Sequence, residues 1–166
     1  ANCLLYCGAR PIFADIDPAT LNLDPAAVQA ALSPRTKAIL PIHFAGLPCP
    51  MDAIHRIARS HNLTVIEDAA HALGAEIDGR RIGGLSDLTT FSFHPVKHIT
   101  TGEGGMVTGN DPALAQGLKR FRNHGIEREV RQRQATTPWA WRQDMVAFGF
   151  NYRLTDIQSA LGLSQL

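Results

Sequence analysis

The stretch Val65-Ile66-Glu67-Asp68-Ala69-Ala70-His71 is a short apolar run that ends in polar side chains, and Phe91-Ser92-Phe93-His94-Pro95-Val96-Lys97 repeats the pattern. Such a run is typical of a buried strand that delivers side chains to a site at its carboxyl end. The next segment, Gly102-Glu103-Gly104-Gly105, is too short and wrongly placed to be a nucleotide-binding fingerprint. We interpret it as a tight turn that lets the backbone approach Lys97. A carboxylate, a hydroxyl and an amine are therefore expected in one site.

Outward from these stretches, apolar or alternating runs predict further strands, which are separated by helix-sized segments. That alternation indicates an α/β fold, and strands joined by helical crossovers are usually parallel. The ligand crevice of an open parallel sheet lies beyond the carboxyl ends of its strands, where both Asp68 and Lys97 fall. The predicted strands are Pro11–Ile16, Ala38–Phe44, Thr64–Glu67, Leu88–Phe93 and Gly105–Thr108.

The segments between the strands carry signals of helices and of one long loop. Asp24 predicts the N-cap of a helix over Pro25–Leu32, whose first residue is a proline. An apolar stripe with helical spacing predicts a second helix after Met51. The segment Asn123–Trp141 lacks regular periodicity, and we expect a long loop of the kind that is more often functional than idle.

Composition limits the class of protein. Of 166 residues, 45% are apolar, and 16 basic residues against 15 acidic ones give a formal net charge of +1, so neither nucleic acid nor an anionic membrane is an expected partner. No apolar run approaches the roughly 20 residues that span a bilayer, and nothing resembles a signal peptide, so we expect a cytoplasmic protein. The cysteines and histidines do not have the spacing of a zinc site, so we expect no bound metal. We also expect the cysteines to be reduced. The residues concerned are Cys3, Cys7, Cys49, His94 and His98.

Asp68, Ser92 and Lys97 supply the groups that pyridoxal 5′-phosphate needs, which are a carboxylate for the pyridine nitrogen, a donor for the phosphate and an amine for a Schiff base. The chain resembles the sugar aminotransferases of the DegT/DnrJ/EryC1/StrS family over nearly its whole length. The resemblance implies an aspartate-aminotransferase-like fold (fold type I), with a three-layer α/β/α large domain and a mostly parallel sheet. The other matching segments are 1–18, 34–38, 41–46 and 149–158.

The ends of the sequence predict a fragment. Ala1 is not an initiator methionine, and Leu166 lies inside an apolar periodic segment that indicates an amphipathic helix. Judged by the resemblance, residues 1–166 form part of the cofactor-binding large domain. An N-terminal segment and the C-terminal small domain are then expected to lie outside this sequence.

The resemblance implies a role for each candidate site residue. Lys97 would bind the cofactor covalently and carry the proton in transamination, while Asp68 would keep the pyridine nitrogen protonated. His71 would lie near the 3-oxygen of the cofactor, and Ser92 would bind its phosphate. Asn151 would reach the phosphate of the neighbouring subunit's cofactor, which implies a homodimer with shared active sites.

Each assignment also has a structural alternative. Taken alone, Lys97 could be a solvated surface lysine and Asp68 a helix N-cap that follows a strand. Ser92 could be a strand-edge serine bonded to backbone, and His71 could be a structural histidine. Glu67 should point to the side of the sheet opposite Asp68, and we assign it no role.

Within the family, segments 91–97, 123–126, 138–139 and 161–166 are similar to the subgroup that makes UDP-4-amino-4,6-dideoxy-N-acetyl-β-L-altrosamine, a pseudaminic acid precursor. The resemblance implies transfer of an amino group, by family analogy from glutamate, to the 4-keto carbon of a UDP-linked 6-deoxy sugar. Two alternatives stay open. One is a sugar dehydratase of the same fold, whose members resemble this chain with histidine in place of Lys97, and the other is a non-catalytic binding or sensory protein.

A basic cluster near the predicted long loop has two interpretations. It could be a solvated face, or one or two of its arginines could bind the diphosphate of a nucleotide sugar, for which a planar bidentate donor is suited. The sequence does not select one arginine. The cluster consists of Lys119, Arg120, Arg122, Arg128, Arg131, Arg133 and Arg142.

Overall fold

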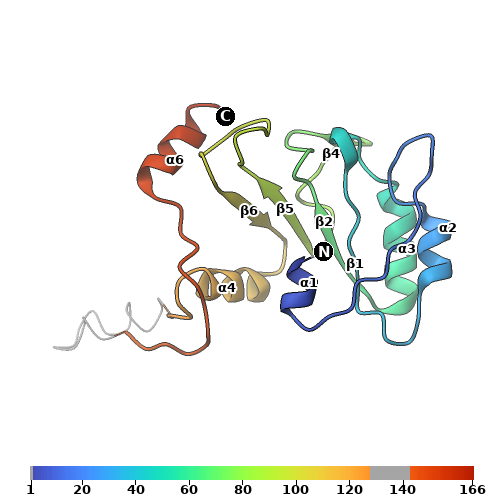
Figure 1. Ribbon diagram of the computed structural model, residues 1–166, viewed down its shortest axis with the longest axis horizontal. Helices are drawn as coiled ribbons and strands as arrows, with labels where there is room; N and C mark the ends of the chain where they lie inside the picture. The colour runs from blue at the N-terminus through green and yellow to red at the C-terminus, as the bar shows by residue number, and fades with distance from the viewer. Residues whose placement is uncertain (1, 128–142) are drawn as a thin grey trace.

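The computed structural model describes residues 2–127 and 143–166, and a four-stranded sheet with the strand order β1-β2-β5-β6 lies at its centre (Figure 1). Strand β1 (Ala38–Ile39) is parallel to β2 (Thr64–Asp68), which is parallel to β5 (Leu88–Ser92). Strand β6 (Gly105–Thr108) runs antiparallel to β5. The predicted α/β fold with a mostly parallel sheet is therefore confirmed, with one antiparallel strand at its edge.

Helices α2 (Pro25–Ala31) and α3 (Met51–His61) form the layer beside β1 and β2 (Figure 1). The Asp24 carboxylate accepts a hydrogen bond of 2.9 Å from the Ala26 N–H, so the predicted N-cap is confirmed. The apolar stripe of α3 packs against the first two strands, because burying one helical face against a sheet removes apolar surface from water. The buried residues of this core are Val28, Ile39, Cys49, Met51, Ile54, Ala58 and Val65.

Two strand predictions are wrong in whole or in part. The segment Pro11–Ile16 forms no strand, and its one ladder contact is an isolated bridge between Ile16 and Leu23. The side chain of Phe13 is 84% exposed, whereas the neighbouring Ala14 is partly buried and packs against the core. The strand expected at Ala38–Phe44 stops after two residues, since Pro41 has no N–H to donate to a ladder.

A small antiparallel hairpin was not predicted. Strands β3 (Glu76–Ile77) and β4 (Arg80–Arg81) are joined by Asp78 and Gly79, whose φ angles are +51° and +70°. Positive φ at both central residues is what a tight two-residue hairpin requires, and Asp-Gly is a sequence signal for it. The sequence therefore contained the information for this turn.

The described part of the chain forms further helical segments of ten residues or fewer. They are α1 (Asn2–Tyr6), the 3₁₀ turn η1 (Phe44–Gly46), α4 (Pro112–Phe121) and α6 (Asp156–Leu163). Among the described residues, no helix is long and apolar enough to cross a membrane. The loop predicted over Asn123–Trp141 lies outside the described residues from position 128 onward, as does the segment 138–139.

Candidate active site

Asp68 is held at the carboxyl end of β2 by its neighbours along and across the sheet. Its N–H donates to the Pro41 carbonyl at 2.8 Å, and its carbonyl accepts from the His43 N–H at 3.0 Å. The carboxylate Oδ1 accepts from the Ala70 N–H at 3.0 Å. Among the described residues, Oδ2 has no hydrogen-bond partner. One oxygen of Asp68 thus fixes the carboxylate, and the other remains available to a ligand.

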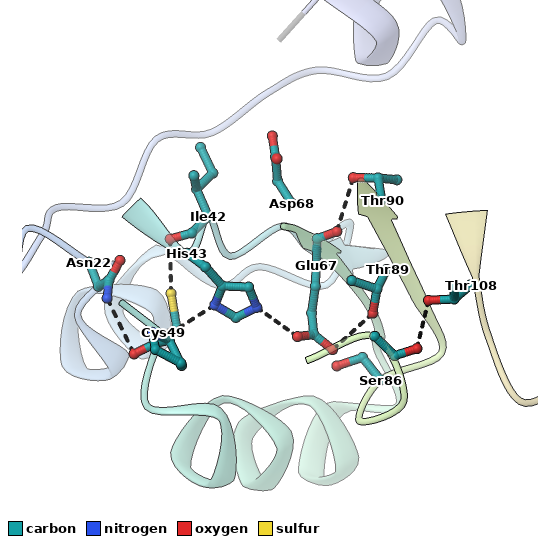
Figure 2. A network of polar contacts seen from close by, with 12 residues as sticks. Asn22, Ile42, His43, Cys49, Glu67, Asp68, Ser86, Thr89, Thr90 and Thr108 are labelled. Carbon is teal, nitrogen blue, oxygen red and sulfur yellow. Dashed lines mark hydrogen bonds and ion pairs between the residues drawn. The ribbon is translucent and has the colours of Figure 1, made fainter. Parts of the chain in front are cut away.

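Strand alternation separates Asp68 from Glu67, as predicted. Figure 2 shows Glu67 pointing toward helix α3 and Asp68 pointing to the opposite side. In the β2–β5 register Asp68 lies opposite Thr90, and Ser92 follows two residues later on β5. Because side chains alternate with a period of two, Asp68, Thr90 and Ser92 share one face of the sheet. That face is only partly buried here, whereas Val65 and Glu67 on the other face are buried.

Lys97 lies on a closed loop between β5 and β6. Its N–H donates to the His94 carbonyl at 2.9 Å, which makes a turn that contains Pro95. The Phe93 N–H donates to the Gly104 carbonyl at 2.9 Å, so the glycine segment closes the loop from its other end. The Lys97 side chain is partly buried, and no described residue forms a hydrogen bond or ion pair with its amine. The amine is therefore uncommitted, on the loop that follows Ser92 at the carboxyl end of β5.

The Ser92 hydroxyl and His71 have local contacts that do not exclude binding a ligand. The Ser92 Oγ accepts a long hydrogen bond of 3.3 Å from the His94 N–H. His71 lies in the turn after Asp68, and its ring meets the ring of Phe44 edge-on with centroids 6.3 Å apart. A Cβ at Gly46, where φ is +87°, would come within 2.9 Å of the His71 carbonyl oxygen. The turn that carries His71 therefore packs tightly against the 3₁₀ turn η1.

Asn151 lies apart from the other site residues in the hydrogen-bond network. Its side chain is exposed, and its backbone forms an isolated antiparallel bridge with Asn123. No hydrogen bond between Asn151 and the Lys97 loop is found in the described part of the chain. Arg120 of the basic cluster contacts Glu127 at 3.5 Å, whereas four arginines of that cluster (128, 131, 133 and 142) lie outside the described residues.

The sequence reasoning missed a buried polar network under Asp68. The Glu67 carboxylate is fully buried, and its Oε2 lies 2.7 Å from Nε2 of His43, which is also fully buried (Figure 2). The other oxygen, Oε1, accepts from the Thr89 hydroxyl at 3.2 Å. His43 Nδ1 accepts from the Cys49 N–H at 3.0 Å, which leaves Nε2 as the nitrogen that donates to Glu67.

Burial acts to raise the pKa of Glu67, because it penalises the charged form. Hydrogen bonding to His43, Ser86 and Thr89 outweighs burial, so the pKa lies below its ordinary value of 4.5. Burial also raises the pKa of the Cys49 thiol to about 11, and its Sγ donates to the Ile42 carbonyl at 3.1 Å. The network therefore holds a carboxylate anion and a neutral thiol beneath the sheet.

The polar groups on the open face and on the loop that follows β5 fit pyridoxal phosphate. It offers a free carboxylate oxygen at Asp68, a hydroxyl at Ser92 and an uncommitted amine at Lys97, which match the cofactor's pyridine nitrogen, phosphate and aldehyde. In the described part of the chain, no group of three or more His, Cys, Asp or Glu side chains could hold a metal ion.

Comparison with known proteins gives consistent matches. The model of the DegT/DnrJ/EryC1/StrS aminotransferase family matches residues 1–166. The chain is 49% identical over 166 residues to GDP-perosamine synthase from Caulobacter vibrioides, covering 100% of this chain and 42% of that protein.

Two solved structures have the same fold. An aminotransferase from Psychrobacter cryohalolentis superposes with a TM-score of 0.94 at 40% sequence identity. Helicobacter pylori PseC, an aminotransferase involved in pseudaminic acid biosynthesis, superposes with a TM-score of 0.90 at 38% sequence identity. Each match covers 99% of this chain and 42% of the solved chain. The expected fold type I architecture is thereby confirmed, and the chain spans less than half the length of these relatives.

Glu67→Gln should make the free energy of unfolding less dependent on pH. Because the folded-state pKa of Glu67 is lowered, its contribution is fully present above the ordinary value of 4.5 and is lost as the pH falls through the folded-state pKa. At neutral pH we expect the free energy of unfolding of Glu67→Gln to be about 1–3 kcal/mol below that of the wild type, since one buried donor loses its charged acceptor. Denaturant unfolding of the cofactor-free protein at several pH values measures both effects.

The stability gap between Glu67→Gln and the wild type should narrow at acidic pH. Glu103→Gln is the matched control, because the Glu103 side chain is exposed. It should change stability little at any pH. A gap for Glu67→Gln that stays constant from neutral to acidic pH would contradict the assignment of a buried anion.

Proposed function

The chain belongs to the DegT/DnrJ/EryC1/StrS aminotransferase family, and from that membership we propose that the protein uses pyridoxal phosphate to transfer an amino group to the 4-keto carbon of a nucleotide-linked 6-deoxy sugar. L-Glutamate is the proposed donor. The observation that carries the proposal is the alignment of Asp68 and Ser92 on one face of the sheet, with Lys97 on the loop that follows. The chain spans 42% of its relatives, so substrates and partners are proposals for the whole protein.

Each site residue has a defined task in this proposal. Lys97 would hold the cofactor through its amine and, once released, would accept the proton from Cα of the amino donor and return it on the other side of the reaction. Asp68 Oδ2 would hold a proton on the pyridine nitrogen, as its Oδ1 is fixed by Ala70. When bound, pyridoxal phosphate supplies an electron sink for the bonds broken at Cα.

The remaining two residues would fix the cofactor in place. Ser92 would donate its hydroxyl to the phosphate, and His71 would lie near the 3-oxygen. Residues 1–166 would then belong to a large cofactor-binding domain. The presence of Lys97 argues against the dehydratase alternative, and its combination with Asp68 and Ser92 argues against a binding protein without catalysis.

The nucleotide has two candidates. A UDP-linked sugar of the pseudaminic acid type is supported by the motif resemblance and by the 38% identity to PseC. A GDP-linked sugar is favoured by the 49% identity to a protein named GDP-perosamine synthase. We retain the UDP-linked sugar as the first candidate and test both.

Asn151 supports a proposed homodimer in which each subunit contributes to its partner's site. Its side chain is exposed, and it lies on the segment before helix α6 rather than on the Lys97 loop. An exposed amide in this place is free to reach a phosphate bound by another subunit.

The full-length protein should convert a UDP- or GDP-linked 4-keto-6-deoxy sugar, with L-glutamate and pyridoxal phosphate, into the 4-amino sugar. Asp68→Asn should still bind cofactor covalently but lose about 100-fold or more of turnover, because a neutral amide cannot hold the pyridine proton. Asp78→Asn, on the β3–β4 turn, is the matched control and should retain activity. Mass spectrometry of the sugar product measures the outcome. No amino sugar from either nucleotide, or an Asp68→Asn variant as fast as wild type, would contradict the proposal.

A mixed dimer should recover activity that each of its parents lacks. Lys97→Ala and Asn151→Ala subunits should each be impaired, whereas their heterodimer would contain one site with both groups intact. Co-expression with two different affinity tags isolates that heterodimer for assay. A purified heterodimer no more active than its parents would argue against shared sites, provided that Asn151→Ala alone is severely impaired.

A further inference from the structure

Helix α6 lies beside the loop that joins β5 to β6 and carries Lys97 (Figure 1). Gln165, two residues after the end of α6, makes one contact with this loop through its side-chain amide. Its Oε1 accepts from the Thr100 N–H at 3.0 Å, and its Nε2 donates to the Thr100 carbonyl at 2.8 Å. One side chain thus satisfies both backbone groups of Thr100, as a neighbouring strand would.

The same helix holds the loop at two further points. Gln158 Nε2 donates to the Glu103 carbonyl at 3.0 Å. Gly162 is buried against Thr101, because a Cβ at this glycine would lie 2.9 Å from Thr101 Cγ2. The contacts at positions 100, 101 and 103 therefore cover the part of the loop between Lys97 and β6.

The loop itself transmits this restraint toward Lys97. The Phe93 carbonyl accepts from both the Thr101 N–H and the Thr100 hydroxyl, each at 3.0 Å. Thr100 is therefore bonded on one side to Phe93, the residue after β5, and on the other side to Gln165, just beyond α6. Lys97 lies three residues before Thr100, within the turn that these bonds close.

We propose that Gln165 is a positioning residue for Lys97. It fixes Thr100, and through the closed loop it limits where the Lys97 amine can move. The inference rests on the proposed function, since it concerns the amine that would act there. Its physical basis is that a displacement of about 1 Å of a reacting group can cost about 100-fold in rate. Gln158, in the first turn of α6, supports the same part of the loop through its bond to the Glu103 carbonyl.

The test compares Gln165→Met with the wild type in the full-length protein. Methionine has nearly the length of glutamine but can neither donate to nor accept from Thr100. Ser164→Ala is the matched control, because Ser164 Oγ donates only to the Leu161 carbonyl at 2.7 Å and has no bond to the loop. Gln165→Glu is a second variant that can accept from the Thr100 N–H but cannot donate to its carbonyl.

The first readout needs no cofactor. Hydrogen exchange of peptides from residues 93–104 in the cofactor-free protein should be faster in Gln165→Met than in Ser164→Ala or wild type. The second readout is the single-turnover half-reaction of the loaded enzyme with L-glutamate, which should slow by about tenfold or more in Gln165→Met. The half-reaction rate of Gln165→Glu should lie between those of Gln165→Met and the wild type. The pH at which the visible band of lysine-bound cofactor titrates should also shift in Gln165→Met.

A purely structural role for Gln165 would give a different result. Well below the melting temperature, Gln165→Met would then react with L-glutamate and titrate as Ser164→Ala does, even if its loop exchanges faster. That result, or unchanged exchange, would overturn the inference. A wild-type protein that forms no lysine-bound cofactor would instead overturn the proposed function, so the two failures are distinguishable.

Discussion

The hydrogen bond of 2.7 Å between His43 Nε2 and Glu67 Oε2 is the constraint on which the candidate site depends. A buried carboxylate is costly unless its oxygens are bonded, and a buried polar group that loses its hydrogen-bond partner costs about 1–3 kcal/mol, and more if it is charged. Here Thr89 on β5 bonds the other oxygen, so this one carboxylate joins β2 to β5 and to the segment after β1. The three segments that surround Asp68 are therefore fixed from the core side.

Because strand side chains alternate, the buried position of Glu67 also determines which side chains lie on the open face of the sheet. Because Glu67 points into the core, Asp68 must point the other way, and the parallel register places Ser92 on its side. The antiparallel return through β6 then closes the loop that carries Lys97. Rigid strands thus supply the carboxylate and the hydroxyl, while a short restrained loop supplies the amine.

Sequence pattern was sufficient for what depends on local periodicity. Strands β2, β5 and β6, the cap at Asp24 and the opposite orientations of Glu67 and Asp68 follow from short-range patterns. The pairing of Glu67 with His43 did not, because the two residues are 24 positions apart and only the fold brings them together. The contact between Gln165 and Thr100 spans 65 positions and was missed for the same reason. The strand expected at Pro11–Ile16 was wrong, because a short apolar run does not by itself specify strand pairing, and this one makes only an isolated bridge to Leu23.

The central claim is that Lys97 supplies the amine that holds the cofactor, and it can be tested by chemical trapping. The full-length protein is mixed with pyridoxal phosphate, reduced with borohydride, digested and mapped by mass spectrometry. Our account predicts the pyridoxyl group on Lys97. Attachment at Lys37 or Lys119, with Lys97 unmodified, would contradict it.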